Sequence, residues 1–181
     1  MAPLRFVPGG AEWLHAAGEG AEAVVRPGGT FTASEAELSG GLLFVAGGIG
    51  ITPLYSILRH AAEARRPNFR AHLLYSAEEP AELALAREID ALAAGSGGAI
   101  GVAKHVTGAT WRGREAEWGG AWGPVGRAEL AAGIRAVAGE GGGADDFSAF
   151  VCGPPAMTDA MVEELAGLGV PEPRIRFERW W

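Results

Sequence analysis

Residues 42–58 read LLFVAGGIGITPLYSIL, and the rest of the chain can be ordered around them. The first five residues are apolar without alternation, which is typical of a strand buried on both faces of a parallel sheet. Three glycines follow within residues 47–50, and they permit a tight turn and close approach of a ligand to the backbone. Thr52 and Pro53 are typical of a helix start. The stretch therefore predicts a strand, a glycine turn and a helix.

A glycine turn at a helix N-terminus favours anion binding, because unpaired N–H groups and the positive end of the helix dipole point to the same place. A tight turn without any ligand is the alternative interpretation. The pattern is not the dinucleotide fingerprint G-x-G-x-x-G, since Pro53 stands at the third glycine. It is not a P-loop either, since no Lys-Ser/Thr pair follows the glycines.

Composition limits the classes of function. The chain has 181 residues, 20% of them charged, and a formal net charge of −7, so nucleic acid and anionic membranes are disfavoured as partners. The uncharged residues 40–58 contain five glycines and a proline, so we expect no membrane span there. Cys152 is the single cysteine, and the four histidines are scattered, so we expect neither a disulfide nor a metal site. Without a signal or transit peptide in this chain, we expect a soluble, intracellular protein.

The first 40 residues have the least regular pattern. Residues 23–25 predict one short strand, residues 27–29 a turn, and residues 30–32 a second strand. Two short strands without partners are marginal by themselves, so we interpret them as the end of something larger.

The remaining chain alternates between strand and helix patterns. After the first unit, strands are predicted at residues 70–76, 100–106, 147–152 and 174–177, and helices at residues 80–94, at residues 128–137 and from Met157 to Leu168, with Gly169 as a left-handed cap. This order predicts an α/β fold, a doubly wound, five-stranded parallel sheet with helices on both faces. In such sheets ligands bind beyond the carboxyl ends of the strands. The segments that hold candidate binding residues follow the ends of four of these strands, at residues 47–53, 76–79, 152–157 and 178–181.

Three motifs carry a resemblance to a known family. They are VAGGIGITP at residues 45–53, VCGPPAM at residues 151–157 and FERWW at residues 177–181. Together they resemble the pyridine-nucleotide motifs of the ferredoxin–NADP reductase superfamily, and the chain is most similar to the oxidoreductase NAD-binding domain-containing proteins of that superfamily, over residues 11–181. The resemblance implies an oxidoreductase domain that binds NAD(P)H and passes hydride to a flavin.

The resemblance also implies roles for single residues. Gly48, Gly50 and Thr52 would hold the pyrophosphate, so a branched side chain at Gly50 is expected to occupy its place. Cys152 would lie beside the nicotinamide, with a buried, inert cysteine as the alternative. The implied catalytic positions are Cys152, Glu178 and Trp180, where Glu178 could instead form a surface ion pair and Trp180 aligns with an aromatic that covers the flavin in relatives. Trp181 is expected to pack against the sheet edge. The implied cofactor-binding positions are Gly47, Gly48, Ile49, Gly50, Ile51, Thr52, Pro53, Ser76, Ala77, Glu78, Cys152, Gly153, Pro154, Pro155 and Met157.

The family's upstream β-barrel, which holds FAD, is mostly missing from this sequence. Residues 1–37 are expected to hold at most its last strand and turn, and residues 38–181 the nucleotide-binding domain. Three explanations stay open: a truncated sequence, a flavin half on another chain, or a nucleotide-binding or assembly module without turnover. The expected partners are accordingly NADH, a flavin-bearing domain or protein and an unidentified electron acceptor. The resemblance leaves a mitochondrial location open.

The end of the second predicted strand favours NADH over NADPH. Glu78 and Glu79 stand there, and no lysine or arginine occurs between His72 and Arg87. A carboxylate accepts a hydrogen bond from a free ribose hydroxyl but repels a 2′-phosphate. The alternative is that both glutamates merely begin the next helix, where negative charge is favoured.

Overall fold

The computed structural model describes residues 10–24, 26, 28–64, 66–139, 142–143 and 146–180. The chain divides into two units, Met1–Thr30 and Phe31–Trp181. The second unit begins earlier than the expected boundary at residue 38, because Phe31 packs edge-to-face on Phe150 with ring centroids 6.1 Å apart. The short helix α2 (Glu35–Leu38) then leads into the sheet, and Ser34 and Glu37 close its N-terminus as a capping box.

The described residues of the first unit contain one helix, α1 (Gly10–Ala16), which the sequence did not predict. Ala23 and Val24 are not in a strand, while Val25 and Pro27 lie outside the described residues. Residues 30–32 also form no strand. The predicted pair of strands is therefore wrong for the residues that can be judged, because a short strand needs a partner to bind its N–H and C=O groups.

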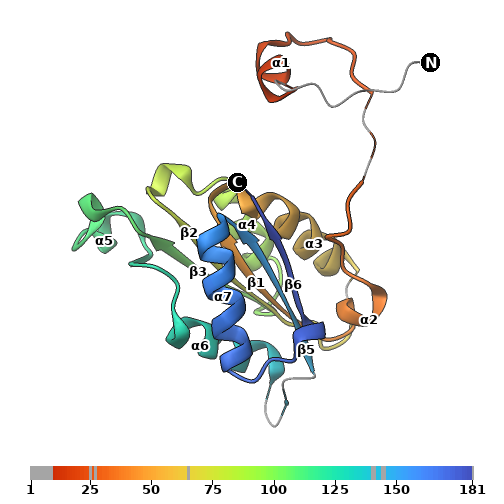
Figure 1. Cartoon of the computed structure of the whole chain (residues 1–181), viewed down its shortest axis with the longest axis vertical. Helices are drawn as coiled ribbons and strands as arrows, with labels where there is room; N and C mark the ends of the chain where they lie inside the picture. The colour runs from red at the N-terminus through yellow and green to blue at the C-terminus, as the bar shows by residue number, and fades with distance from the viewer. Residues whose placement is uncertain are drawn as a thin grey trace. The chain divides into compact units, whose positions relative to one another are not determined.

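The second unit is built on one parallel sheet (Figure 1). Its strands are β1 (Gly41–Gly47), β2 (Ala71–Ala77), β3 (Ile100–Val106), β4 (Ala121–Trp122), β5 (Phe147–Gly153) and β6 (Ile175–Arg179), in the order β4-β3-β2-β1-β5-β6. The predicted α/β class, parallel sheet and five strands are confirmed, and β4 adds a sixth. Two residues are too few to show a strand period, which explains why β4 was missed.

Helices cover both faces of the sheet, as Figure 1 shows. Helices α3 (Ile51–Glu63) and α4 (Ala86–Ala94) lie on one face, and α6 (Arg127–Ala138) and α7 (Pro155–Gly167) on the other. Every residue of β1 is buried, because its side chains alternate between two apolar clusters, one under each pair of helices. The shorter elements are η1 (Gly48–Gly50), η2 (Pro80–Glu82), η3 (Ala109–Trp111), α5 (Glu115–Trp118) and η4 (Glu172–Arg174).

Of two predictions about where helices begin and end, one is wrong and one is confirmed. The helix predicted at residues 80–94 is interrupted: η2 ends at Glu82, Leu85 adopts a left-handed φ of 59°, and α4 begins only at Ala86. The left-handed cap predicted at Gly169 is confirmed, with a φ of 86°. None of the helices in the described part of the chain is long and apolar enough to cross a membrane.

Candidate functional site

The sheet reverses its order between β1 and β5, and this places the two glycine motifs side by side. From β1 the chain moves outward to β2, β3 and β4, and it then returns to β5 on the other side of β1. Ala46 pairs with Cys152 at the carboxyl ends of these strands. A crevice outside such a reversal is where doubly wound sheets bind ligands.

The turn after β1 continues directly into α3. The helix begins at Ile51, with Gly50 as its cap and no side-chain capping bond. Thr52 therefore does not cap the helix as its position suggested; instead its Oγ1 donates to the Ile49 carbonyl at 3.0 Å and fixes the turn. The Ile51 N–H donates to the Gly48 carbonyl and Pro53 has no N–H, so what the start of the helix offers an anion is chiefly the positive end of its dipole.

Gly48 and Gly50 differ in what surrounds them. At Gly48, which has a φ of +52°, a Cβ atom would meet nothing within 4 Å, so a ligand can approach the backbone. At Gly50 a Cβ atom would lie 2.6 Å from the carbonyl carbon of Cys152 and 2.8 Å from the nitrogen of Gly153. Gly50 therefore lets the turn pack on β5, and the expectation that a side chain there would occupy the space of the pyrophosphate is wrong.

Gly47 and Gly153 let the ends of β1 and β5 come together under α7. A Cβ atom on Gly153 would lie 3.1 Å from the Cα of Gly47 and 2.8 Å from the Cε of Met157. A Cβ atom on Gly47 would lie 2.5 Å from the Sδ of Met157 and 3.0 Å from the Cδ of Pro154. Pro155 begins α7, and Thr158 donates to the carbonyl of Gly153 at 3.2 Å. Both motifs thus form one packed unit.

The three predicted catalytic residues lie together at the ends of β5 and β6. Cys152 pairs in register with Glu178, and the backbone N–H of Trp180 donates to the carbonyl of Gly153 at 2.8 Å. Trp180 also packs on the apolar cluster that contains Cys152. No ion pair of Glu178 forms with the described residues, which argues against the surface ion pair considered above. Trp181 lies outside the described residues.

The Cys152 thiol is buried and held protonated. Burial, with a smaller contribution from the nearby Glu178 carboxylate, raises the pKa of Cys152 to about 12, although a hydrogen bond from the Trp180 side chain acts in the opposite direction. A neutral thiol is a poor nucleophile. Covalent catalysis by Cys152 is therefore disfavoured, and its small size and polarisability are the properties that the site can use.

The end of β2 supplies a buried hydroxyl and an exposed carboxylate. Ser76 Oγ donates to the carbonyl of Ala46 at 3.3 Å and lies 3.9 Å from the Sδ of Met157, so it joins β2 to β1 and α7. Ala77 is 7% exposed, whereas Glu78 is exposed and forms no ion pair with the described residues. The backbone N–H groups of Glu78 and Glu79 both donate to the Glu82 carboxylate. The Glu78 carboxylate itself forms no hydrogen bond with the described residues, so it is free to bind another partner.

The structure brings one arginine toward this end that sequence reasoning missed. Gly108 donates to the carbonyl of Glu78 at 2.9 Å, and Trp122 Nε1 donates to the carbonyl of Gly108 at 3.0 Å. The guanidinium of Arg112 lies over the Trp122 ring, 5.0 Å from its centroid. The search for basic residues between His72 and Arg87 could not find Arg112, because its link to Glu78 through Trp122 and Gly108 exists only in the folded residues 107–122.

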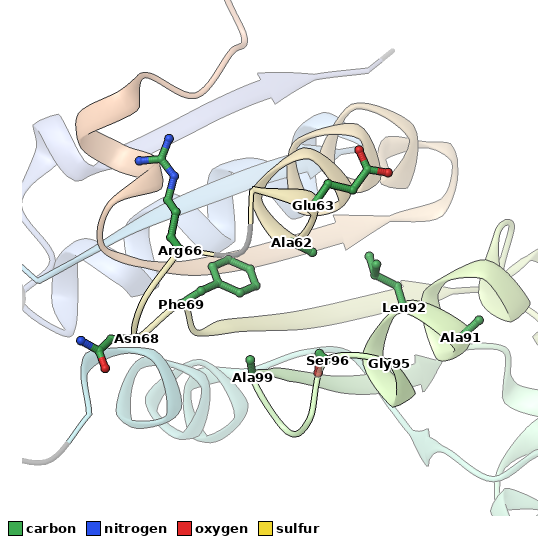
Figure 2. Close-up of a pocket in the computed structure, with 10 residues that line it drawn as sticks. All are labelled: Ala62, Glu63, Arg66, Asn68, Phe69, Ala91, Leu92, Gly95, Ser96 and Ala99. Carbon is green, nitrogen blue, oxygen red and sulfur yellow. The ribbon is translucent and has the colours of Figure 1, made fainter.

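A pocket of about 790 Å³ lies at the opposite, amino edge of the sheet, between the ends of α3 and α4 (Figure 2). Helix C-termini carry partial negative charge, so this edge disfavours a phosphate. Its charged groups are also engaged, since Arg59 pairs with Glu63 at 2.7 Å and Arg66 pairs with Glu35. The pocket is lined by Ala62, Glu63, Arg66, Asn68, Phe69, Ala91, Leu92, Gly95, Ser96 and Ala99. We do not assign the nucleotide to it.

No group of three or more histidine, cysteine or acidic side chains within the described ranges could hold a metal ion. The groups gathered at the carboxyl edge are the N-terminus of α3, the Cys152 thiol, the Glu78 and Glu178 carboxylates and the Trp180 ring, which suit an organic anion with flat ring systems.

Comparison with known proteins matches residues 44–163 to the family described as oxidoreductase NAD-binding domain. Oxidoreductase NAD-binding domain-containing protein 1 from Homo sapiens is 33% identical over 172 residues, which cover 88% of this chain and 52% of that protein. NADH-cytochrome b5 reductase 1 from Cryptococcus neoformans is 32% identical over 134 residues, which cover 74% of this chain and 44% of that protein. The chain spans about half the length of the curated relatives it matches.

Solved structures share the fold. The flavohem-like FAD/NAD binding domain of nitric oxide dioxygenase from Vibrio cholerae aligns with a TM-score of 0.70 and 22% identity, over 94% of this chain and 64% of that chain. The Amycolatopsis cytochrome P450 reductase GcoB aligns with a TM-score of 0.67 and 22% identity, over 97% of this chain and 50% of that chain. These findings confirm the resemblance drawn from the three motifs. Since the family match covers more than half of the sequence, the chain belongs to the oxidoreductase NAD-binding domain family.

Proposed function

We propose that this chain binds NADH across the carboxyl ends of β2, β1 and β5 and presents the nicotinamide end for hydride transfer to a flavin. The observation that carries the proposal is the contact of Gly47 with Gly153 at the reversal of the sheet, next to the open backbone at Gly48. A dinucleotide needs one anion site with a ring site on either side, and the strand ends supply these three places in a row.

The pyrophosphate is assigned to the turn before α3. Gly48 leaves room for close approach, and the hydrogen bond from Thr52 to Ile49 holds the turn in one conformation. A helix N-terminus favours a nearby anion by about 0.3–1 kcal/mol at an exposed site. The turn therefore contributes orientation as well as affinity.

The nicotinamide is assigned to the ends of β5 and β6. NADH supplies the hydride when it is bound, and the residues of the chain have to hold it in position and keep water out. Cys152 is fully buried and Trp180 packs on the same apolar cluster, so in this proposal Trp180 moves aside when the nicotinamide reaches the thiol. Glu178 pairs in register with Cys152 and supplies an exposed carboxylate beside it. The family resemblance implies an aromatic that covers the flavin at this position, and we assign Trp180 that role.

The preference for NADH is assigned to Glu78. Two unit charges about 4 Å apart interact by roughly 4 kcal/mol at an effective dielectric of 20, an upper bound for this wet edge. A 2′-phosphate beside Glu78 would meet that repulsion, whereas a ribose hydroxyl would donate to it. Arg112 opposes the preference in this proposal. Its guanidinium carries no ion pair to the described residues and lies over the Trp122 ring, and Trp122 is linked through Gly108 to the backbone carbonyl of Glu78.

A second candidate function is nucleotide binding without turnover. Its support is that the described residues before β1 form helices α1 and α2 and no strand, so they supply no part of a flavin-binding barrel. We expect little bound flavin in the purified chain, and a yellow protein with stoichiometric FAD would contradict that expectation.

One experiment separates the two functions. The purified chain is titrated with NADH by calorimetry, and free FAD or FMN is then added while the nicotinamide absorbance band is followed. Binding with oxidation of NADH above the rate without protein supports the reductase, and binding without oxidation supports the module. If NADH does not bind at all, both assignments fail.

A further inference from the structure

A buried histidine lies in the same row of the sheet as two residues of the candidate site. His105 is 5% exposed, although it is close to the carboxyl end of β3. It pairs in register with Ser76, which in turn pairs with Gly47. Side chains of one row point to the same face, and neighbouring parallel strands are about 4.8 Å apart. Ser76 and His105 are therefore neighbours on the face covered by α6 and α7.

The imidazole of His105 has no hydrogen-bond partner within the described part of the chain. Its Nδ1 atom is buried and unpaired. Two other buried polar atoms of the described residues share this condition, Arg66 Nε and Trp118 Nε1, but neither lies in the row of the site. Leaving a buried polar atom unsatisfied is destabilising, and such atoms usually find a protein group, a water or a ligand.

The position of His105 indicates which ligand group could be its partner. The site runs from Cys152 on β5 through Gly48 after β1 to Glu78 after β2, and β3 is the next strand in this direction. A dinucleotide with its nicotinamide at β5 and its pyrophosphate at β1 has its adenosine at β2 and β3. His105 lies under this half of the site.

We propose that the His105 imidazole hydrogen-bonds to the adenosine half of the bound dinucleotide. The inference rests on the proposed function. A neutral imidazole offers one donor and one acceptor, which match a ribose hydroxyl or the edge of adenine. A rotation of the ring about its second side-chain torsion exchanges the edge that carries Nδ1 with the edge that carries Cδ2, without movement of the backbone.

The experiment compares His105→Phe with wild type and with His60→Gln, a control that removes an exposed histidine from α3. Affinities for NADH and for ADP-ribose are measured by calorimetry, and melting temperatures without ligand are measured in parallel. Phenylalanine keeps the ring but removes both nitrogens. We expect both affinities to fall about tenfold, which corresponds to about 1.4 kcal/mol, while the melting temperature of the free protein stays unchanged or rises. The control should match wild type in both affinities.

The inference is overturned if His105→Phe binds both ligands as wild type does, and a loss of stability in that variant would then show that the imidazole serves the fold. If the variant does not fold, the imidazole ¹⁵N resonances of wild type decide the matter: a shift of the His105 signals on addition of ADP-ribose supports the contact, and unchanged signals overturn it. A wild-type chain that binds neither ligand contradicts the proposed function itself, so the two failures are distinguishable.

Discussion

Replacing Gly50 by alanine should damage the fold rather than the ligand space. The new Cβ atom would lie 2.6 Å from the Cys152 carbonyl carbon and 2.8 Å from the Gly153 nitrogen, closer than the 3.0 Å below which real Cβ contacts essentially do not occur. Both neighbours are backbone atoms of β5, so no side chain can rotate to relieve the overlap. The turn has to move away from β5.

The expected loss follows from two opposing effects. Overpacking in a close-packed core costs about 1–3 kcal/mol, and rigid backbone neighbours favour the upper end of that range. Replacing glycine by alanine also restricts the unfolded chain, and this raises the free energy of unfolding by about 0.4–1 kcal/mol where the backbone conformation is compatible. The net loss is therefore about 2 kcal/mol. For a chain of this size each kcal/mol lowers the melting temperature by about 2–4 °C, so Gly50→Ala should melt about 4–8 °C below wild type.

Gly48→Asn is the matched control on the same turn. Asparagine tolerates the left-handed conformation, and the position faces open space, so the melting temperature should change by less than about 3 °C. Its side chain fills the approach to the turn, so NADH affinity should fall several-fold. Differential scanning calorimetry and NADH titration of both variants provide the test. A Gly50→Ala protein that melts with wild type would refute the packing argument, and a Gly48→Asn protein with wild-type affinity would remove Gly48 from the site.

Three further predictions concern the charged and titratable groups. Because the pKa of Cys152 is raised to about 12, the native thiol should react with iodoacetamide at pH 8 about a thousandfold more slowly than an ordinary cysteine, and denaturant should restore the rate; fast native alkylation, followed by mass spectrometry, would contradict the burial. Burial lowers the pKa of His72, so the unfolded state takes up its proton first as the pH falls below about 6.5, and the free energy of unfolding should drop from there downward. Urea unfolding at pH 7.5 and 5.5 should show a smaller drop in His72→Gln, and an equal drop in both proteins would rule out His72 as the cause. Glu78→Arg should raise NADPH affinity and Arg112→Gln should lower it, each with a smaller effect on NADH; wild-type protein that binds NADPH at least as tightly as NADH would contradict the role given to Glu78.

Local patterns were sufficient to predict most of the second unit. The apolar run before the glycines predicts β1 because both of its faces are covered by helices, and only such a strand lacks alternation. The cap at Gly169 was predictable because a left-handed residue at a helix end is commonly glycine. Leu85 has the same backbone conformation without any sequence signal for it, since a bulky residue is not expected there. That residue explains why the helix predicted at residues 80–94 is interrupted.

The outline of the site was predictable, and its internal division of roles was not. The strand ends are brought to one edge by the order of the sheet, which the alternation of strands and helices predicts. Whether a glycine faces a ligand or a neighbouring strand depends on what packs against it, and this separates Gly48 from Gly50. His105 and Arg112 escaped notice for the same reason, because the pairing of His105 with Ser76 and the packing of Arg112 on Trp122 are not visible in a local sequence pattern.

The two ends of the edge differ in a way that fits a division of labour between orientation and affinity. At β1 and β5, glycine backbones lie in contact and Cys152 is fully buried, so even one added methyl group meets rigid atoms. Hydride transfer requires the reacting rings to be held about 3–3.5 Å apart, and a rigid end of the sheet favours this.

At β2 and β3 the Glu78 carboxylate and the Arg112 guanidinium are exposed and free of ion pairs to the described residues. Polar groups of this kind tune affinity and specificity without touching the reacting atoms. Substitutions at the β2–β3 end should therefore change the dissociation constant of NADH, while those at the β1–β5 end should change the rate of hydride transfer together with the stability of the fold.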